Sequence, residues 1–324
     1  MHLPPQDGWR EGDLASPDGG GVVPNRSQAP LHEQDWWRLQ RVLPNLVRRA
    51  ELLAALRGWF AARGFLEVET PVVARSPGLE VHLAALETRA CGETRYLITS
   101  PEYHMKRLLS AGMPRIVYLG RAFRDHERGH EHLTEFTMLE WYRADEGPDA
   151  LMADVEALVA LATGRERPWT RLTVAEALAR WGTPTDDPDD VLRQLVERVE
   201  PELGKLGAVF LTEWPRALAS LARLKPGDPS VSERFEAYVD GVELANGFGE
   251  LTDAVEQRAR FEQDLAERRA QGLPEYPIDE AFLDALAAGL PPCAGIALGV
   301  DRLVMLATGA KHIDDVTAFP SRLA

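Results

Sequence analysis

The sequence predicts a globular protein built from both helices and strands, and three segments carry this prediction. Residues 46–63 place apolar side chains along one stripe of a helix, which Gly64 ends. In residues 136–142, the side chains alternate in type from one position to the next, as expected for a strand with two different faces. Residues 295–306 read as a glycine-rich strand that runs into an apolar helix. The chain has no internal repeat, so we expect one large core or two modest ones.

Length and composition describe an ordinary globular protein of 324 residues, 45% hydrophobic and 27% charged. No apolar run approaches the roughly 20 residues that a membrane span needs. The N-terminus lacks the basic and then apolar regions of a secretion signal. The two cysteines, Cys91 and Cys293, make neither a disulfide framework nor a zinc set. We therefore expect a cytoplasmic protein without a membrane partner.

The net charge of −15 bears on the choice of partner, because 51 acidic residues stand against 36 basic ones. Proteins that hold a nucleic-acid backbone usually carry basic stripes. No cluster of lysine and arginine here resembles a tRNA-binding track. Total charge does not describe a single face, so it argues against tRNA as a partner without excluding it.

The elements follow one another in a clear order after an irregular start. Residues 1–43 begin rich in Pro, Gly, Asp and Ser, and we expect a disordered or loosely docked tail, with a folded cap as the alternative. The helix at 46–63 is followed by a strand at 65–70, which Pro71 stops. Further amphipathic helices are expected over residues 148–162, 174–181, 189–199 and 255–271.

The segment from Gly120 to Tyr142 is the most informative part of the chain. Arg124 ends a short apolar run, and a loop rich in charge and histidine follows. The strand after the loop then places four side chains on one face, namely Phe136, Met138, Glu140 and Tyr142. A ring, a carboxylate and a phenol opposite an arginine make a poor core but a good wall for a nucleotide beside a polar small molecule. A surface hairpin with a mixed face is the alternative.

Taken together, residues 46–71, 120–142 and 295–306 resemble the three signature motifs of class II aminoacyl-tRNA synthetases, in the order of that family. Residues 99–106, 135–142 and 243–253 are similar to lysyl-tRNA synthetase. They resemble still more closely its short paralogues, the ligases that attach (R)-β-lysine to a lysine of elongation factor P. The likeness runs from about Pro44 to the end of the chain.

This resemblance implies a fold of the α+β class, an antiparallel sheet flanked by helices, as one catalytic domain over residues 44–324. It also implies a homodimer formed through the helix and strand of residues 46–71. A full lysyl-tRNA synthetase carries an N-terminal OB-fold that binds the anticodon and needs about a hundred residues. Only some forty residues precede the first motif here, so we expect a catalytic core alone.

The implied activity is that of an ATP-dependent ligase with Mg²⁺. It would form the adenylate of (R)-β-lysine and transfer the aminoacyl group to a lysine side chain of elongation factor P. Adenylation needs cations around the phosphates and reactants held in line. The resemblance gives Arg124 and Arg302 catalytic roles, the first at the α-phosphate and the second at the γ-phosphate. The implied ATP-binding residues are Arg124, Asp125, His126, His132, Phe136, Glu243, Leu244, Gly299 and Arg302.

The resemblance also implies an amino-acid pocket and a metal pair. The pocket residues are Ser100, Pro101, Glu102, Tyr142, Asn246, Glu250 and Ala297. Lysyl-tRNA synthetases have glycine in place of Ala297, and one added methyl group matches the one-carbon difference between α- and β-lysine. Glu236 and Glu243 match the magnesium ligands. Simple alternation would put these two glutamates on opposite faces, so we expect an irregularity at the turn Asp240–Gly241 to bring them together.

The chain departs from the family pattern at two positions. His126 replaces a glutamate that helps to hold ATP, and Leu133 replaces an asparagine near the amino acid. These changes leave open another amino acid, another acceptor including tRNA, or a non-catalytic synthetase-like sensor. A zinc site at His126, His130 and His132 is the less favoured interpretation, because no fourth ligand stands near them in the sequence.

Overall fold

The structure is a computed structural model that describes residues 31–126 and 129–321. The first thirty residues of the predicted tail lie outside this part. The chain divides into two compact units, residues 1–41 and 42–324, and the fold below is that of the second. Helix α1 (Leu31–Ala61) begins earlier than the predicted Leu46 and contains Pro44. A proline inside a helix removes one hydrogen bond without necessarily ending the helix.

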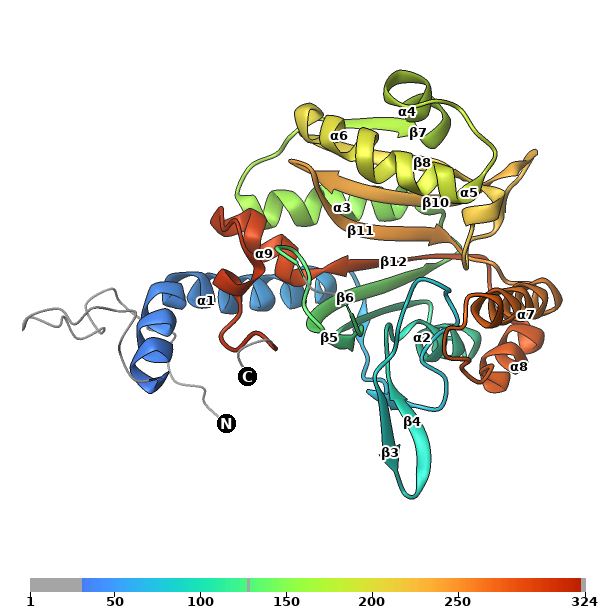
Figure 1. Cartoon of the computed structure of the whole chain (residues 1–324), viewed down its shortest axis with the longest axis horizontal. Coiled ribbons are helices and arrows are strands. Elements are labelled where there is room, and N and C mark those ends of the chain that lie inside the picture. The colour runs from blue at the N-terminus through green and yellow to red at the C-terminus, as the bar shows by residue number, and fades with distance from the viewer. Residues whose placement is uncertain (1–30, 127–128, 322–324) are drawn as a thin grey trace, which may run out of the picture. The chain divides into compact units, whose positions relative to one another are not determined.

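A large twisted sheet forms the body of this unit (Figure 1). Its strands lie in the spatial order β1 (Leu66–Glu67), β5 (Arg115–Phe123), β6 (Glu135–Ala144), β12 (Cys293–Gly299), β11 (Val242–Gly249), β10 (Asp228–Val239), β8 (Ala208–Pro215) and β7 (Trp169–Thr173), with β9 (Leu224–Lys225) beside β10. The central pairings are antiparallel as predicted, whereas β1 joins β5 and β7 joins β8 in parallel. The strand predicted at 65–70 is limited to two residues.

A small second sheet and the helices complete the unit. The small sheet has the order β2 (Val73–Ala74), β4 (Glu93–Leu97) and β3 (Glu87–Ala90), and Figure 1 shows β3 and β4 as a hairpin that extends away from the large sheet. The helices after α1 are α2 (Glu102–Ser110), α3 (Pro148–Thr163), α4 (Val174–Trp181), α5 (Pro188–Gln194), α6 (Glu200–Leu206), α7 (Ala254–Ala270), α8 (Glu280–Gly289) and α9 (Val300–Thr308). The helix predicted at 189–199 continues beyond α5 as a short π-helix, Leu195–Val199.

One face of the large sheet is closed by an apolar core. Side chains of α1, α3 and α9 pack on it, among them Leu56, Val155 and Leu303. The strands meet them with residues such as Trp141 and Ile296, which are almost fully buried. We call this the core face. Burial of apolar side chains is the main favourable term in folding. Because alternate residues of each strand must therefore lie on the core face, the residues between them point to the opposite face.

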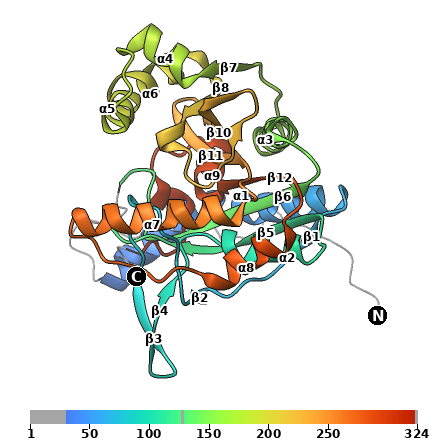
Figure 2. The same cartoon turned by 90° about the vertical axis from the view of Figure 1, so that its right-hand side faces the viewer.

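On the opposite face, the site face, the helices of the described part of the chain pack over the two ends. Helices α2, α7 and α8 pack together over β5 and the end of β6, and Figure 2 shows them gathered on that side. Helices α4 to α6 pack against β8 through Val209 and Leu211. Between these groups, the middle strands β6, β12, β11 and β10 present polar side chains. The register aligns Glu140, Ala297 and Asn246 across three of them.

A β-bulge in β11 decides which of its residues reach the site face. Ala245 pairs with Ala237, but the next pair is Glu243 with Tyr238, so Leu244 has no partner in the register. Leu244 and Ala245 both pack in the apolar core, and Glu243 and Asn246 therefore share the site face. The bulge is not needed to bring Glu236 and Glu243 together: the turn at Asp240–Gly241 pairs Tyr238 with Glu243, and Glu236, two residues before Tyr238, faces the same side. The turn expected to do this is the right one, but it is not irregular. That turn is a regular two-residue hairpin connection in which both residues have positive φ.

The observed fold confirms the predicted α+β class. Within residues 31–126 and 129–321, no helix combines the length and the apolar character that a membrane span would need.

Two glycine substitutions test how tightly the core face is packed. In Gly247→Ala, the new Cβ would lie 2.5 Å from Cζ of Phe235, so we expect a loss of about 1–3 kcal/mol in the free energy of unfolding. The matched control Gly58→Ala adds the same methyl group to α1 with no atom within 4 Å. It should raise stability by about 0.5–1 kcal/mol. Urea denaturation of both variants measures this, and a neutral Gly247→Ala would contradict the packing described.

Candidate active site

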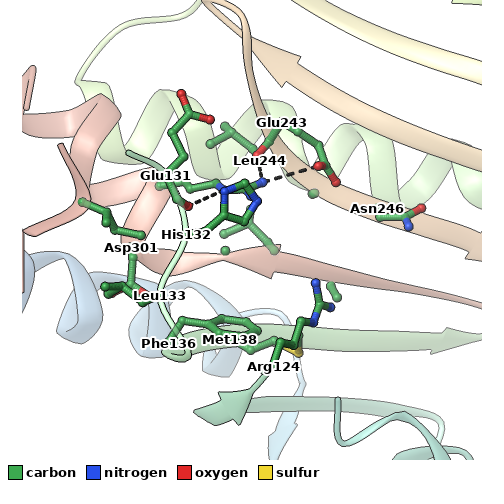
Figure 3. A pocket seen from close by; sticks show the side chains of 16 residues that line it. Arg124, Glu131, His132, Leu133, Phe136, Met138, Glu243, Leu244, Asn246 and Asp301 are labelled. Atoms are coloured by element: carbon green, nitrogen blue, oxygen red, sulfur yellow. Dashed lines mark hydrogen bonds and ion pairs between the residues drawn. The ribbon is translucent and has the colours of Figure 1, made fainter. Parts of the chain in front are cut away.

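Two adjoining cavities lie on the site face. The first, of about 230 Å³, is formed by the loop before β6, the middle strands and the start of α9. Figure 3 shows Phe136, Met138 and Arg124 on one side of it and His132 with Glu243 on the other. The second cavity, of about 330 Å³, lies over β6, β12 and β11 beside α2. We call them the nucleotide cavity and the amino-acid cavity, after the groups predicted to line them.

Arg302 is held in the nucleotide cavity by hydrogen bonds from three directions. Its Nη1 donates to the carbonyl oxygen of Glu243 at 2.7 Å, and its Nε donates to that of Glu131 at 3.2 Å. Its Nη2 lies 2.7 Å from Nε2 of His132, which must accept because a guanidinium has no acceptor. The guanidinium is thus fixed in orientation before any ligand arrives, as stabilisation of a charged phosphate requires.

The position of Arg302 depends on its neighbour Asp301 at the start of α9. Asp301 accepts from the backbone N–H of Thr137 at 2.7 Å and forms an ion pair with Arg49 of α1 at 2.6 Å. Arg49 also donates to Oγ1 of Thr137 at 2.7 Å. This buried network ties α1, β6 and α9 together, so the arginine at the first turn of α9 has little freedom to move.

Most of the predicted ATP-binding residues come together in this cavity. Those that line it are Arg124, His132, Phe136, Glu243, Leu244, Gly299 and Arg302. The guanidinium of Arg124 lies 5.3 Å from the centre of the Phe136 ring, a suitable distance for a cation–π contact. Asp125 and His126 do not line the cavity, and the His126 side chain is 84% exposed. Their proposed contacts with ATP stay predictions.

The three loop histidines and Leu133 do not behave as one group. His130 packs edge-on against His312, whereas His132 contacts Arg302. Among the residues that the structure describes, no three His, Cys, Asp or Glu side chains are arranged to hold a metal ion. Leu133 is buried and lines the nucleotide cavity, not the amino-acid cavity to which we assigned it.

The predicted amino-acid residues also converge, with one exception. Those that line the second cavity are Ser100, Glu102, Tyr142, Asn246, Glu250 and Ala297. Pro101 instead begins α2, where its carbonyl accepts from the N–H groups of His104 and Met105. Gly295 makes room for two of the lining residues. A Cβ there would lie 2.1 Å from the Tyr142 ring and 2.4 Å from Glu250 Oε1.

A buried lysine holds two of these carboxylates. Lys106, with a side chain that is 0% exposed, lies 2.5 Å from Glu102 and 2.6 Å from Glu250. Glu140 accepts from the hydroxyl groups of Ser100 at 2.7 Å and Tyr142 at 2.8 Å. Seven acidic residues line the cavity, Glu80 among them, against two arginines, and Lys106 lies behind Glu102 and Glu250. The cavity is suited to a ligand that brings positive charge.

Burial sets the protonation of this cavity. It raises the pKa of Glu140 to about 8, helped by the charge of Glu102 and opposed by the two hydroxyl donors. It also raises the pKa of Glu250 to about 8, although Lys106 opposes the shift. Burial alone would lower the pKa of Lys106, but the two neighbouring carboxylates outweigh it and raise that pKa.

The two cavities share part of their lining, namely Arg124, Met138, Asn246 and Ala297. A molecule in the amino-acid cavity can therefore reach one in the nucleotide cavity without crossing a wall of side chains. The predicted metal pair lies beside this junction. Glu243 lines the nucleotide cavity, while Glu236 accepts from Arg234 and Tyr238, each at 2.7 Å. Burial and then the charge of Glu243 raise the pKa of Glu236 to about 7.

Comparison with known proteins agrees with this geometry. Residues 33–323 match the family model of class II tRNA synthetases (D, K and N). The chain belongs to the class II tRNA synthetase family. Curated relatives include elongation factor P–(R)-β-lysine ligases of Salmonella paratyphi B, Salmonella heidelberg and Salmonella typhi, each 45% identical over 89% of this chain and 98% of its own length. These matches confirm the predicted resemblance and the assignment as an ATP-dependent, synthetase-like ligase.

Sequence reasoning placed Glu140 on the face predicted to line this class II site, but it assigned no role to Lys106 and Glu80. Glu140 stood in the recognised alternation, and Lys106 follows Glu102 by four residues on a helix, so both had a usable signal. Glu80 had none, because it lies in a loop without any periodic pattern.

Removal of the internal lysine should test the charge balance of the site. We expect Lys106→Met to lower the free energy of unfolding by about 3–5 kcal/mol at pH 8, because two buried carboxylates lose their counter-ion. The loss should shrink as pH falls towards 4.5, because the carboxyl group of Glu250 then begins to take up a proton in the unfolded chain as well. Urea denaturation across this pH range measures both effects.

Lys205→Met is the matched control, since Lys205 is 69% exposed and pairs with Glu202 on the surface. It should cost about 0–1 kcal/mol at every pH. Equal losses in the two variants would contradict the role given to Lys106.

Proposed function

We propose that this class II synthetase-like ligase activates (R)-β-lysine with ATP and transfers it to a lysine side chain of elongation factor P. The observation that carries the proposal is the junction of the two cavities. An acidic, buried pocket opens onto a cavity in which two arginines and an aromatic ring are already placed. The printed names of the curated relatives supply the identities of the amino acid and the acceptor.

The charge of the amino-acid cavity supports a substrate with two ammonium groups. Its seven acidic lining residues outnumber its two arginines together with Lys106, and buried negative charge is stable only when it is paired. A diamino acid supplies two positive charges and one negative. The carboxylate would lie at the junction, where the side chain of Asn246 can donate to it.

The residues of the nucleotide cavity support adenylate formation. In that step, a carboxylate oxygen attacks the α-phosphorus and pyrophosphate leaves. Arg124 lies at the junction and suits the α-phosphate, while Arg302 lies deeper and suits the leaving phosphates. Phe136 offers a flat surface for adenine. In the second step, the acceptor amine attacks the acyl carbon, an amide forms, and AMP leaves with loss of a proton.

Mg²⁺ fits the same cavity. Glu243 lines it, and its charge acts on Glu236, so a divalent cation would relieve the repulsion between the two carboxylates. When bound, it would neutralise charge on the phosphates. We propose Glu243 as the nearer ligand, because Glu236 is already engaged by Arg234 and Tyr238.

A homodimer through residues 46–71 is part of the proposal. Val47 on α1 and Leu66 on β1 lie in this segment, are 46% and 55% exposed, and would be covered in such a dimer. A cytoplasmic location likewise stays a prediction.

Amino-acid-dependent exchange of pyrophosphate into ATP tests the first step. We expect exchange to be strongest with (R)-β-lysine and weaker with α-lysine. The enzyme should then transfer the aminoacyl group from the adenylate to elongation factor P and not to tRNA. Exchange with a different amino acid would contradict the proposed substrate, transfer to tRNA would contradict the proposed acceptor, and ATP binding without any exchange would indicate a sensor.

Removal of Arg302 should separate chemistry from folding. We expect Arg302→Ala to lower exchange at least about 100-fold, because the phosphates lose a fixed positive charge. Its thermal midpoint should stay near that of the wild type. Arg171→Ala is the matched control, since Arg171 forms a surface pair with Asp149, and it should retain full exchange. Normal exchange in Arg302→Ala would refute the assigned role.

The methyl group of Ala297 should control the choice between lysine isomers. Ala297 lies between Glu140 and Asn246 in the register, where the amino acid meets the nucleotide. We expect Ala297→Gly to move the β-to-α ratio of kcat/KM about 10-fold towards α-lysine. Exchange kinetics with both isomers measure the ratio, and an unchanged value would contradict this part of the proposal.

A further inference from the structure

The loop before β3 carries a carboxylate to which no role has yet been given. Glu80 lines the amino-acid cavity. Its Oε2 is buried and accepts no hydrogen bond from any residue in the ranges 31–126 and 129–321. A buried acceptor without a donor costs free energy, so it is an exception that calls for an explanation. A ligand that donates to Glu80 would supply one.

The loop is fixed in a way that keeps Glu80 in place. Gly78 has φ of 124°, and a Cβ there would lie 2.7 Å from Glu80 Oε2. Thr99 Oγ1 donates to the carbonyl of Pro77 at 2.6 Å. Buried Arg268 of α7 donates to the carbonyl of Glu80 at 2.9 Å and to two further carbonyls of the same loop. These contacts hold the backbone of the loop, and the carboxyl group also has a hydrogen bond with the backbone at Glu80, which leaves Oε2 without a donor.

Glu80 lies within electrostatic reach of the junction between the two cavities. Arg124, at the junction of the two cavities, is one of the charges that act on it, together with Glu102 and Asp264, and the Tyr103 hydroxyl is also close. Burial and then the charge of Glu102 raise the pKa of Glu80 to about 7, whereas Arg124 opposes the shift.

Glu250 lies at the end of the amino-acid cavity that is further from the nucleotide cavity. It contacts Lys106 and crosses over Gly295 beside the Tyr142 ring. In the register of β12, Gly295 is one row further from the nucleotide cavity than Ala297. A diamino acid with its carboxylate at the junction would therefore place its distal ammonium near Glu250 and its other ammonium near Glu80.

We propose that Glu80 binds the amino group nearer to the carboxylate, the 3-amino group of (R)-3,6-diaminohexanoate, and so determines specificity at that position. This inference rests on the function proposed above. Neither the sequence motifs nor the comparisons assign this residue to the site. In this arrangement, Glu250 and Tyr142 recognise the 6-amino group, and Glu80 recognises the 3-amino group independently of them.

Substrate analogues that lack one amino group each can separate the two roles. (R)-β-Lysine is compared with 6-aminohexanoate, which lacks the 3-amino group, and with (R)-3-aminohexanoate, which lacks the 6-amino group. Pyrophosphate exchange gives kcat and KM for β-lysine, and competition gives the inhibition constants of the two analogues. We expect Glu80→Gln to raise KM for β-lysine about 10- to 100-fold with little change in kcat. The inhibition constant of (R)-3-aminohexanoate should rise equally, and that of 6-aminohexanoate should stay within about 2-fold.

The controls distinguish binding from folding. Glu80→Gln keeps the size of the side chain and removes an unpaired buried charge, so its thermal midpoint should equal or exceed that of the wild type. Glu87→Gln removes an exposed carboxylate just beyond the same loop and should change none of the constants. A loss that is equal for both analogues, or no loss for β-lysine, would overturn the role of Glu80 alone. No exchange by the wild-type enzyme with β-lysine would instead overturn the proposed function, and the role of Glu80 with it.

Discussion

The site depends on one constraint: each middle strand must bury one face against α1, α3 and α9, which leaves the other face for chemistry. Regular alternation meets this constraint in β6 and β12. In β11 it would put Glu243 and Asn246 on opposite faces, because they are three residues apart. The bulge at Leu244 buries one extra residue and returns both to the site face. A single unpaired residue thus lets one strand contribute side chains to both cavities.

Electrostatics impose the second constraint. The amino-acid cavity gathers carboxyl groups that burial drives towards the neutral form, and Lys106 offsets only part of their charge. Such an arrangement weakens the fold, since unpaired buried charge is unfavourable. A dicationic ligand reverses this penalty, whereas a neutral side chain of the same shape cannot. Selectivity for charge therefore follows from desolvation as much as from contact geometry.

The sequence predicted those parts of the site whose residues follow the alternation of a strand or the order of the motifs. Alternation correctly placed Phe136 and Tyr142 on one face, and the motif order identified Arg124 and Arg302. It failed where periodicity breaks: the bulge at Leu244 has no signature in the local sequence, because Leu and Ala suit a regular strand equally well. It also gave no role to Glu80, since the loop around it is defined by distant donors such as Arg268.

The two halves of the site are supported by different parts of the fold. Arg302 is fixed by Asp301, Arg49 and Thr137, which connect the core helices to the sheet. The loop that carries Glu80 is fixed instead by α7, through an arginine that contacts only backbone carbonyls in that loop. Side chains of this loop can therefore change without breaking the contacts that hold Arg302. A family built in this way can alter its amino acid while it keeps its adenylation chemistry, because recognition and activation meet only at the shared junction.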